Sequence, residues 1–288
     1  MKREMRIGAM AVGGIAAAAV GSVVIGTRSW RRGTRSALER MTRLDDAPHG
    51  VLPTTFTSGM LEGLPAPVRR YFEFALTPGQ PLVRRAHFRW SGSFLARPPE
   101  GWSPFTAEQQ CSVRPRGFVW DADIRMWPLV PTRVRDSYVA GEGAMLARVA
   151  AVVPVVDLHG TPEMAAASLL RYLAEATWYP TALLPCEGVT WDAIDESTAR
   201  ATITDGPTTV SLDAHFGERG EIERISAMRH RDVKGTPVLT PWMGHLREYQ
   251  RMNGMMIPMS GEVEWLMPER RLPYWRGRIV SAEYDLAG

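Results

Sequence analysis

Apolar and polar residues alternate along most of the chain after residue 82, which is the pattern of β-strands with one buried face. In GFVWDAD, Phe118, Trp120 and Ala122 fall on one side of the expected strand, and Asp121 and Asp123 fall on the other. The same alternation marks residues 86–94, 105–113, 133–140, 144–156, 189–195, 199–204, 209–216, 221–231, 245–251, 261–267 and 274–286. Short Gly- and Asp-containing turns link many of these segments, so we expect antiparallel hairpins.

Two segments have the three- and four-residue apolar spacing of helices instead. The first follows Pro67, with apolar residues from Val68 to Leu76. The second begins with Thr161 as N-cap and Pro162 at the first helical position, and we expect it to run to about residue 178, before a proline stops it. Residues 237–242 contain two prolines and are expected to form an irregular connection.

These elements predict an α+β fold. We expect a large curved antiparallel sheet of about ten to twelve strands, which can curl into a half-barrel, covered by two helices. An N-terminal transmembrane helix is expected in addition. The domain boundaries that follow are 1–43 for a membrane anchor with its basic flank, 44–63 for a linker, and 64–288 for one antiparallel α+β domain.

The expected anchor begins at Ile7 and ends at Gly26, twenty residues without a charge. A bilayer core of roughly 30 Å needs about 20 apolar residues in a helix, so this segment is long enough to span. A cleaved signal peptide is the alternative, because alanine and glycine make the segment only modestly apolar. The continuing arginines, among them Arg28 and Arg35, favour an uncleaved single-pass anchor.

The sequence does not determine which side of the membrane the domain faces. The basic flank after the anchor favours a cytoplasmic domain by the positive-inside rule, but the same flank could contact anionic lipid. We interpret residues 28–43 as a solvated interfacial helix or tether. The net charge of +3 owes much to the first 43 residues, and acidic residues are mixed through the remainder, so we expect no nucleic acid partner.

Known catalytic and cofactor motifs are not found in the sequence. No phosphate-binding or dinucleotide-binding glycine loop follows a strand, so we expect no cofactor. Asp213, His215 and His230 could form a metal site only if a hairpin brought them together, and we expect none. Two cysteines, Cys111 and Cys186, have no metal-ligand spacing, and either two free thiols or one disulfide would fit them.

The carboxylates suggest one functional class, an acid–base enzyme. Asp121 and Asp123 share a strand face, and Asp136 lies on the next expected strand, before a turn that carries Glu142. Paired acids support general acid–base chemistry when their environments separate their pKa values. An enzyme that uses Asp121, Asp123, Asp136 or Glu175 is therefore the alternative, and it requires these groups to converge in one pocket.

Aromatic residues favour a binding protein. The chain has ten tryptophans and fifteen methionines, side chains that suit apolar and irregular ligands. We expect a lipid-like or other apolar small molecule to bind beneath the second helix. The expected binding residues are Trp120, Arg171, Glu175, Trp178, Tyr179, Trp191 and Trp242. An envelope scaffold, with a sheet edge or aromatic surface that binds another protein, is the third hypothesis.

Several motifs between residues 64 and 284 occur in a characteristic order. They are GFVWDA, DSYVAGEG, RYLAEATWYPTALLP, VTWDAID, PW and PYWRG, of which RYLAEATWYPTALLP and VTWDAID are the most specific. In this order the sequence resembles an uncharacterised bacterial family classed as a domain of unknown function, which brings no established activity or site residues. More loosely, it is similar to lipoprotein-carrier folds. That similarity implies an open half-barrel whose helices cover an apolar cavity.

Overall fold

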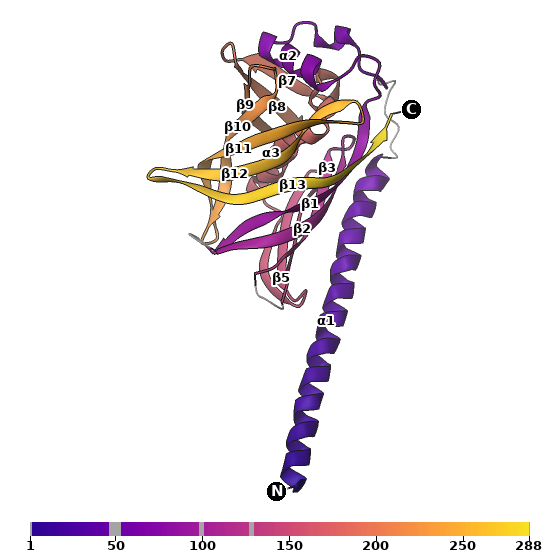
Figure 1. Ribbon diagram of the computed structural model, residues 1–288, viewed down its shortest axis with the longest axis vertical. Helices are drawn as coiled ribbons and strands as arrows, with labels where there is room; N and C mark the ends of the chain where they lie inside the picture. Colours follow the sequence, from indigo (N-terminus) through magenta and orange to yellow (C-terminus); the bar gives the residue numbers. More distant parts are fainter. Residues whose placement is uncertain (1, 46–52, 98–100, 127–129, 288) are drawn as a thin grey trace.

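Thirteen strands form one antiparallel sheet in the computed structural model of this protein (Figure 1). The structure describes the backbone of residues 2–45, 53–97, 101–126 and 130–287, and the side chains of residues 20–43, 53–95, 101–126 and 130–287. The strands are β1 (Val83–Arg97), β2 (Gly101–Ser112), β3 (Gly117–Ile124), β4 (Thr132–Val139), β5 (Glu142–Val149), β6 (Val153–His159), β7 (Val189–Ala193), β8 (Thr198–Asp205), β9 (Thr208–Phe216), β10 (Ile222–Val233), β11 (Thr236–Met252), β12 (Met255–Met267) and β13 (Arg270–Leu286).

Two meanders meet in the middle of the sheet. The strand order is β6-β5-β4-β3-β2-β1-β13-β12-β11-β10-β9-β8-β7, so every neighbouring pair is consecutive in the chain except β1 and β13. Gly92 of β1 lies opposite Gly277 of β13 in this central pairing. The sheet is not closed, because β6 and β7 form its two edges.

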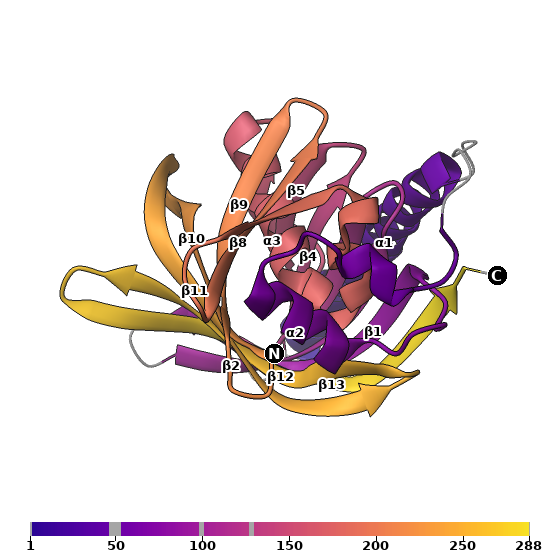
Figure 2. The same ribbon diagram turned by 90° about the horizontal axis from the view of Figure 1, so that it is seen from above.

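The chain must therefore cross from one edge of the sheet to the other between β6 and β7. Helix α3 (Pro162–Glu175) and three 3-10 turns, η2 (Ala176–Trp178), η3 (Pro180–Leu183) and η4 (Pro185–Glu187), make this crossing. They lie inside the curve of the sheet (Figure 2). Helix α3 packs closely on β5, since a Cβ atom at Gly143 would lie 2.4 Å from the carbonyl oxygen of Met164.

The predicted signals at the start of α3 are confirmed. The Thr161 side chain accepts a hydrogen bond from the backbone N–H of Met164 at 3.1 Å, and Pro162 takes the first helical position. Helix α2 (Ala66–Ala75) also forms where the apolar spacing predicts it. Both helices contribute buried side chains to a single core on the inner face of the sheet, including Tyr71, Phe72, Leu169 and Leu173.

Two strand predictions are wrong in detail. Thirteen strands form instead of ten to twelve, partly because residues 144–156 are divided between β5 and β6 by a turn at residues 150–152. Residues 237–242 belong to β11 and are not an irregular connection. This part of β11 pairs with β10, whereas its pairing with β12 begins only at Trp242. The prolines are tolerated because they precede the part of β11 that pairs on both sides.

Helix α1 (Lys2–Asp45) packs against the outer face of the sheet, on β2, β3 and β4. Asp121 accepts hydrogen bonds from the indole N–H of Trp30 at 2.9 Å and from the hydroxyl of Thr34 at 2.7 Å. Arg135 lies over the Trp30 ring at 4.8 Å and donates to the Thr34 hydroxyl. Trp30 is only 2% exposed. Residues 28–43 are helical, as one form of the interpretation had it, but the expectation that they are solvated is wrong, because one side of this helix is docked on the sheet.

The expected anchor from Ile7 to Gly26 belongs to α1, but the side chains of residues 7–19 lie outside the described residues. Within the described part of the chain, no helix combines the length and hydropathy of a membrane span. Of the expected linker, residues 46–52 lie outside the described residues. After them, Phe56 and Leu61 are buried in the domain core, and η1 (Ser58–Leu61) leads toward α2.

Replacing Asp121 with alanine is expected to detach the C-terminal half of α1 from the sheet. Trp30 and Thr34 lose their acceptor and the half-buried Arg135 loses its nearest carboxylate, so we expect a loss of about 1–3 kcal/mol. Hydrogen exchange across residues 28–43 measures the effect. Glu142→Ala is the control, because its ion pair with Arg40 is exposed and contributes at most about 1 kcal/mol. Equal exchange in both variants would contradict the docking role of Asp121.

Candidate functional site

A cavity of about 560 Å³ lies between α3 and the inner face of the sheet. Its walls come from both meanders, so it forms only when the sheet curves around α3. Most of its lining side chains are apolar or aromatic, and five are tryptophans: Trp120, Trp178, Trp242, Trp265 and Trp275. A volume of this size falls within the range of about 300–1,000 Å³ that is usual for small-molecule sites.

One charged cluster contributes to the wall on the side of α3. Arg171 donates from Nη1 to Asp136 Oδ2 at 2.6 Å and from Nε to Glu175 Oε1 at 2.7 Å. Gln109 donates to the other oxygen of Glu175 at 2.6 Å. The Arg171 guanidinium also lies 4.8 Å from the centre of the Phe118 ring. These contacts satisfy most of the polar atoms that folding removes from water.

The charge of Arg171 is stabilised despite its burial. Burial alone would lower the pKa of the guanidinium, but Glu175 and Asp136 raise it by more, so the pKa lies above its ordinary value. Arg171 therefore stays cationic inside the protein. The sequence places Arg171 and Glu175 one helical turn apart, which indicates an exposed pair of little consequence, and only their burial with Asp136 makes them part of the cavity wall.

The opposite wall is an aromatic group from β10 to β13. Tyr274 stacks on Trp265 with ring centres 5.5 Å apart, and its hydroxyl accepts from the indole N–H of Trp242 at 2.9 Å. Arg229 donates to the same hydroxyl at 3.2 Å and lies over the Trp242 ring. Because these rings hold one another in place, this wall presents a rigid apolar surface to the cavity.

The cavity reaches the molecular surface beside β6. Val155 and Leu158 line it, yet they are 55% and 38% exposed. From the facing strand β10, the exposed Asp232 and the half-buried Arg231 also line it. The cavity is therefore open to solvent where β6 and β10 contribute its lining.

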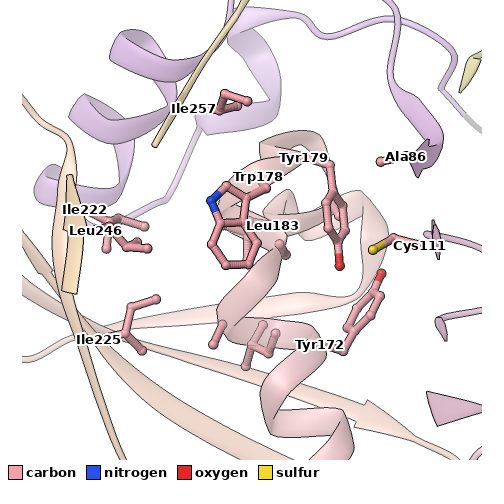
Figure 3. Close-up of a cluster of buried hydrophobic side chains, with 14 of the residues drawn as sticks. Ala86, Cys111, Tyr172, Trp178, Tyr179, Leu183, Ile222, Ile225, Leu246 and Ile257 are labelled. Atoms are coloured by element: carbon pink, nitrogen blue, oxygen red, sulfur yellow. The ribbon is translucent and has the colours of Figure 1, made fainter. Parts of the chain in front are cut away.

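Five of the seven predicted binding residues line this cavity: Trp120, Arg171, Glu175, Trp178 and Trp242. The other two lie in the core outside the cavity lining. Trp191 packs edge-on against Phe72 and donates its indole N–H to the carbonyl of Leu183 at 3.0 Å. Tyr179 is buried near Tyr172, and its hydroxyl points toward Cys111 (Figure 3).

Burial sets the protonation of this inner group. It raises the pKa of the Cys111 thiol, and it raises the pKa of the hydroxyls of Tyr172 and Tyr179. These groups stay neutral at physiological pH, which suits a structural core better than an acid–base site. Cys186 is half-buried, and neither cysteine forms a disulfide.

Several lining residues were not anticipated from the sequence. Met145 and Ala147 of β5 face the cavity, as do Met164 and Ala167 of α3. The alternation in β5 and the three-residue spacing in α3 identify one face of each element. Neither pattern shows that these two faces line a cavity instead of packing against each other.

The carboxylates of the enzyme hypothesis do not converge. Asp136 and Glu175 meet at Arg171 on the inner side of the sheet, whereas Asp121 binds α1 on the outer side. Asp123 pairs there with Arg133 at 3.2 Å. The arrangement that an acid–base enzyme with all four groups requires is therefore not present among these described residues.

Two of the three residues considered for a metal site, Asp213 and His215, have other partners. Asp213 forms a two-bonded ion pair with Arg200. His215 lies within 2.9 Å of the Ser226 hydroxyl, and burial lowers the pKa of its imidazole. Over the described ranges, no group of three or more His, Cys, Asp or Glu residues has the geometry to hold a metal ion.

Comparisons with solved structures find sheets of similar kind at low identity. A LolA superfamily protein from Nitrosomonas europaea matches with a TM-score of 0.40 and 8% identity, over 76% of this chain and 92% of that one. A putative outer membrane lipoprotein-sorting protein domain from Vibrio parahaemolyticus matches with a TM-score of 0.38 and 7% identity, over 70% and 86%. A β-barrel-like protein of domain family DUF1849 from Brucella abortus has a TM-score of 0.28 and 11% identity, over 71% and 98%.

No curated protein matches the chain. The sequence profile of a family described only as a family of unknown function, DUF6920, matches residues 62–284. This range agrees with residues 64–284, over which the motif order resembles an uncharacterised family, so that resemblance is confirmed. On this match, the chain belongs to the DUF6920 family of unknown function.

Proposed function

We propose that this protein binds a lipid-like or other apolar small molecule in the cavity between α3 and the curved sheet, and that residues 7–26 hold it at a membrane. The observation that carries the proposal is the composition of the cavity wall. Large apolar and aromatic side chains surround most of a 560 Å³ space, and the buried charges are gathered at one place, around Arg171. Such a space favours a ligand with a long apolar part and few polar atoms.

The position of α1 supports membrane attachment near the opening. A Cβ atom at Gly26 would lie 2.5 Å from the carbonyl oxygen of Ala151, so α1 passes directly beside the turn between β5 and β6. Before this point α1 projects past the sheet (Figure 1). This contact brings together two exposed apolar pairs that are far apart in the sequence. They are Val24 and Ile25 of α1, and Val152 and Val153 beside β6. A ligand that leaves a bilayer at this end would meet the strand that borders the cavity.

Filling the cavity tests the proposal. Ala147 of β5 lines the cavity, so Ala147→Trp should occupy the space and abolish binding, with little loss of stability because the cavity has room for the larger ring. Native mass spectrometry of the full chain, after gentle extraction and after addition of lipid, measures the bound mass. We expect the wild type to carry an apolar ligand and Ala147→Trp to be empty.

The matched control is Ala144→Trp on the same strand. Residues three apart in a strand point to opposite faces, and Ala144 does not line the cavity. We expect this variant to bind as the wild type does, and thermal unfolding checks that both variants are folded. Wild-type protein that stays empty and shows no affinity for added lipid would end the proposal.

A further inference from the structure

The cavity wall contains one buried carboxylate oxygen without a hydrogen-bond partner among the described residues. Asp136 of β4 is 3% exposed and lines the cavity. Its Oδ2 accepts from Arg171, but its Oδ1 has no partner among the described residues. In the ladder, Trp120 of β3 and Met145 of β5 lie on either side of Asp136 on the same face of the sheet. The free oxygen of Asp136 therefore lies among the apolar side chains that would contact the hydrocarbon chain of a ligand.

In the structure no neighbouring donor reaches this oxygen, and the Trp120 indole N–H on the paired strand is itself without a partner among the described residues. The Arg171 Nε atom is used by Glu175, and the guanidinium is flanked by the rings of Phe118 and Trp120. Both Glu175 oxygens are occupied, one by Arg171 and one by Gln109. One arginine and two carboxylates leave a net charge of −1 in this cluster. An unpaired buried acceptor in such surroundings is unfavourable until a donor reaches it.

We infer that the cavity binds an amphiphile whose inner end carries a hydrogen-bond donor, such as a hydroxyl, amide or ammonium group, which donates to Asp136 Oδ1. This inference rests on the proposed function and adds the chemistry of the ligand's polar end. A carboxylate at the same place would bring two more acceptors and a second negative charge to the Asp136 carboxylate, which has no donor to offer. The site should therefore discriminate against fatty acids and in favour of long-chain alcohols, amides or amines.

The arginines of β10 are the competing location for an anionic group. Arg229 and Arg231 line the cavity, and each has an Nε atom without a partner over the described ranges. Both residues are only half-buried, so water and salt weaken their attraction for an anion. Water and salt do not screen the Asp136 carboxylate in this way, because it lies almost fully out of contact with solvent. We therefore expect the polar end of the ligand to be selected at Asp136.

A pair of brominated ligands with the same chain tests this selection. 12-Bromododecan-1-ol and 12-bromododecanoate differ only at the polar end, and bromine quenches the fluorescence of nearby tryptophans, of which five line the cavity. The full chain is kept in solution by an amphipathic polymer, and each ligand is titrated at pH 8. In the wild type we expect the alcohol to bind about tenfold tighter than the acid, or more. In Ala147→Trp, neither should quench.

Two variants of equal charge separate the free acceptor from the net charge. Asp136→Asn must keep its oxygen toward Arg171, which has only donors, and so presents an amide N–H where Oδ1 was. We expect it to lose the preference for the alcohol or to reverse it. Glu175→Gln removes the same charge but leaves Asp136 Oδ1 free, and we expect it to retain a preference for the alcohol.

Each outcome has a distinct meaning. Equal binding of the two ligands by the wild type, or tighter binding of the acid, would overturn the inference and leave the proposed function standing. A preference that survives in Asp136→Asn, shown to be folded by circular dichroism, would also overturn it. Quenching by neither ligand in the wild type would contradict the proposed function itself, and quenching that persists in Ala147→Trp would place the binding outside this cavity.

Discussion

Replacing Arg171 with methionine is expected to lower the free energy of unfolding by about 3–5 kcal/mol, because it leaves two buried carboxylates without their cation. Asp136 and Glu175 both pair with Arg171 and are otherwise surrounded by the wall of the cavity. Denaturant unfolding of the full chain measures the loss. Methionine is close to arginine in length and apolar stem, so the change removes charge with a limited loss of packing.

A triple variant separates lost charge compensation from lost packing. Arg171→Met combined with Asp136→Asn and Glu175→Gln makes the whole cluster neutral while it keeps similar volumes. We expect it to recover most of the stability that the single change removes, since a buried ionic group replaced as a whole is often close to neutral in effect. A triple variant as unstable as Arg171→Met would contradict the explanation by uncompensated charge.

Truncating Trp178 to alanine is expected to cost about 3–5 kcal/mol and to enlarge the cavity. Trp178 is 5% exposed, and its ring packs edge-on against Trp90 with centres 4.6 Å apart. The ring stands between the end of α3 and the sheet residues Ile222 and Leu246 (Figure 3). Its indole N–H has no partner within the described part of the chain, so the loss comes from packing alone. Because Trp178 lines the cavity, the variant should also accept a bulkier apolar ligand.

The control for this variant is Trp102→Ala. Trp102 of β2 is half-exposed and its main described contact is with Arg276, whose guanidinium lies 4.4 Å from the ring centre. Loss of such a contact should cost about 0.5–1 kcal/mol. Thermal or denaturant unfolding compares the two variants. Similar losses at both positions would mean that Trp178 does not support the core as its burial indicates.

Local patterns were sufficient to predict the elements of this fold. Alternation identified the strands, and the Thr161–Pro162 start of α3 formed as expected, because capping and strand amphipathicity depend on neighbours in sequence. The prolines of β11 misled this reasoning. Whether a strand tolerates proline depends on which of its sides is paired, and the pairing partners of β11 are separate strands.

The candidate site was predictable only in part. Of the residues chosen from aromatic content and the motif around Trp178, five line one cavity, whereas Tyr179 and Trp191 turn into the core. The spacing of apolar residues identifies the buried face of a helix or strand. It does not give the distance from that face to the opposite wall of the cavity. That distance depends on the curvature of the whole sheet and on how α3 rests on β5 at Gly143.

By itself, then, the sequence determined the strand-rich fold, the two covering helices and the family, all of which follow from short-range patterns. Tertiary structure alone decided the pairing of β1 with β13, which joins residues far apart in the chain, and the docking of Trp30 on Asp121. It also decided that Arg171, Glu175 and Asp136 share a buried wall. The physical reason is that burial is a property of position in the assembled sheet, and burial changes how strongly the members of a charged cluster depend on one another.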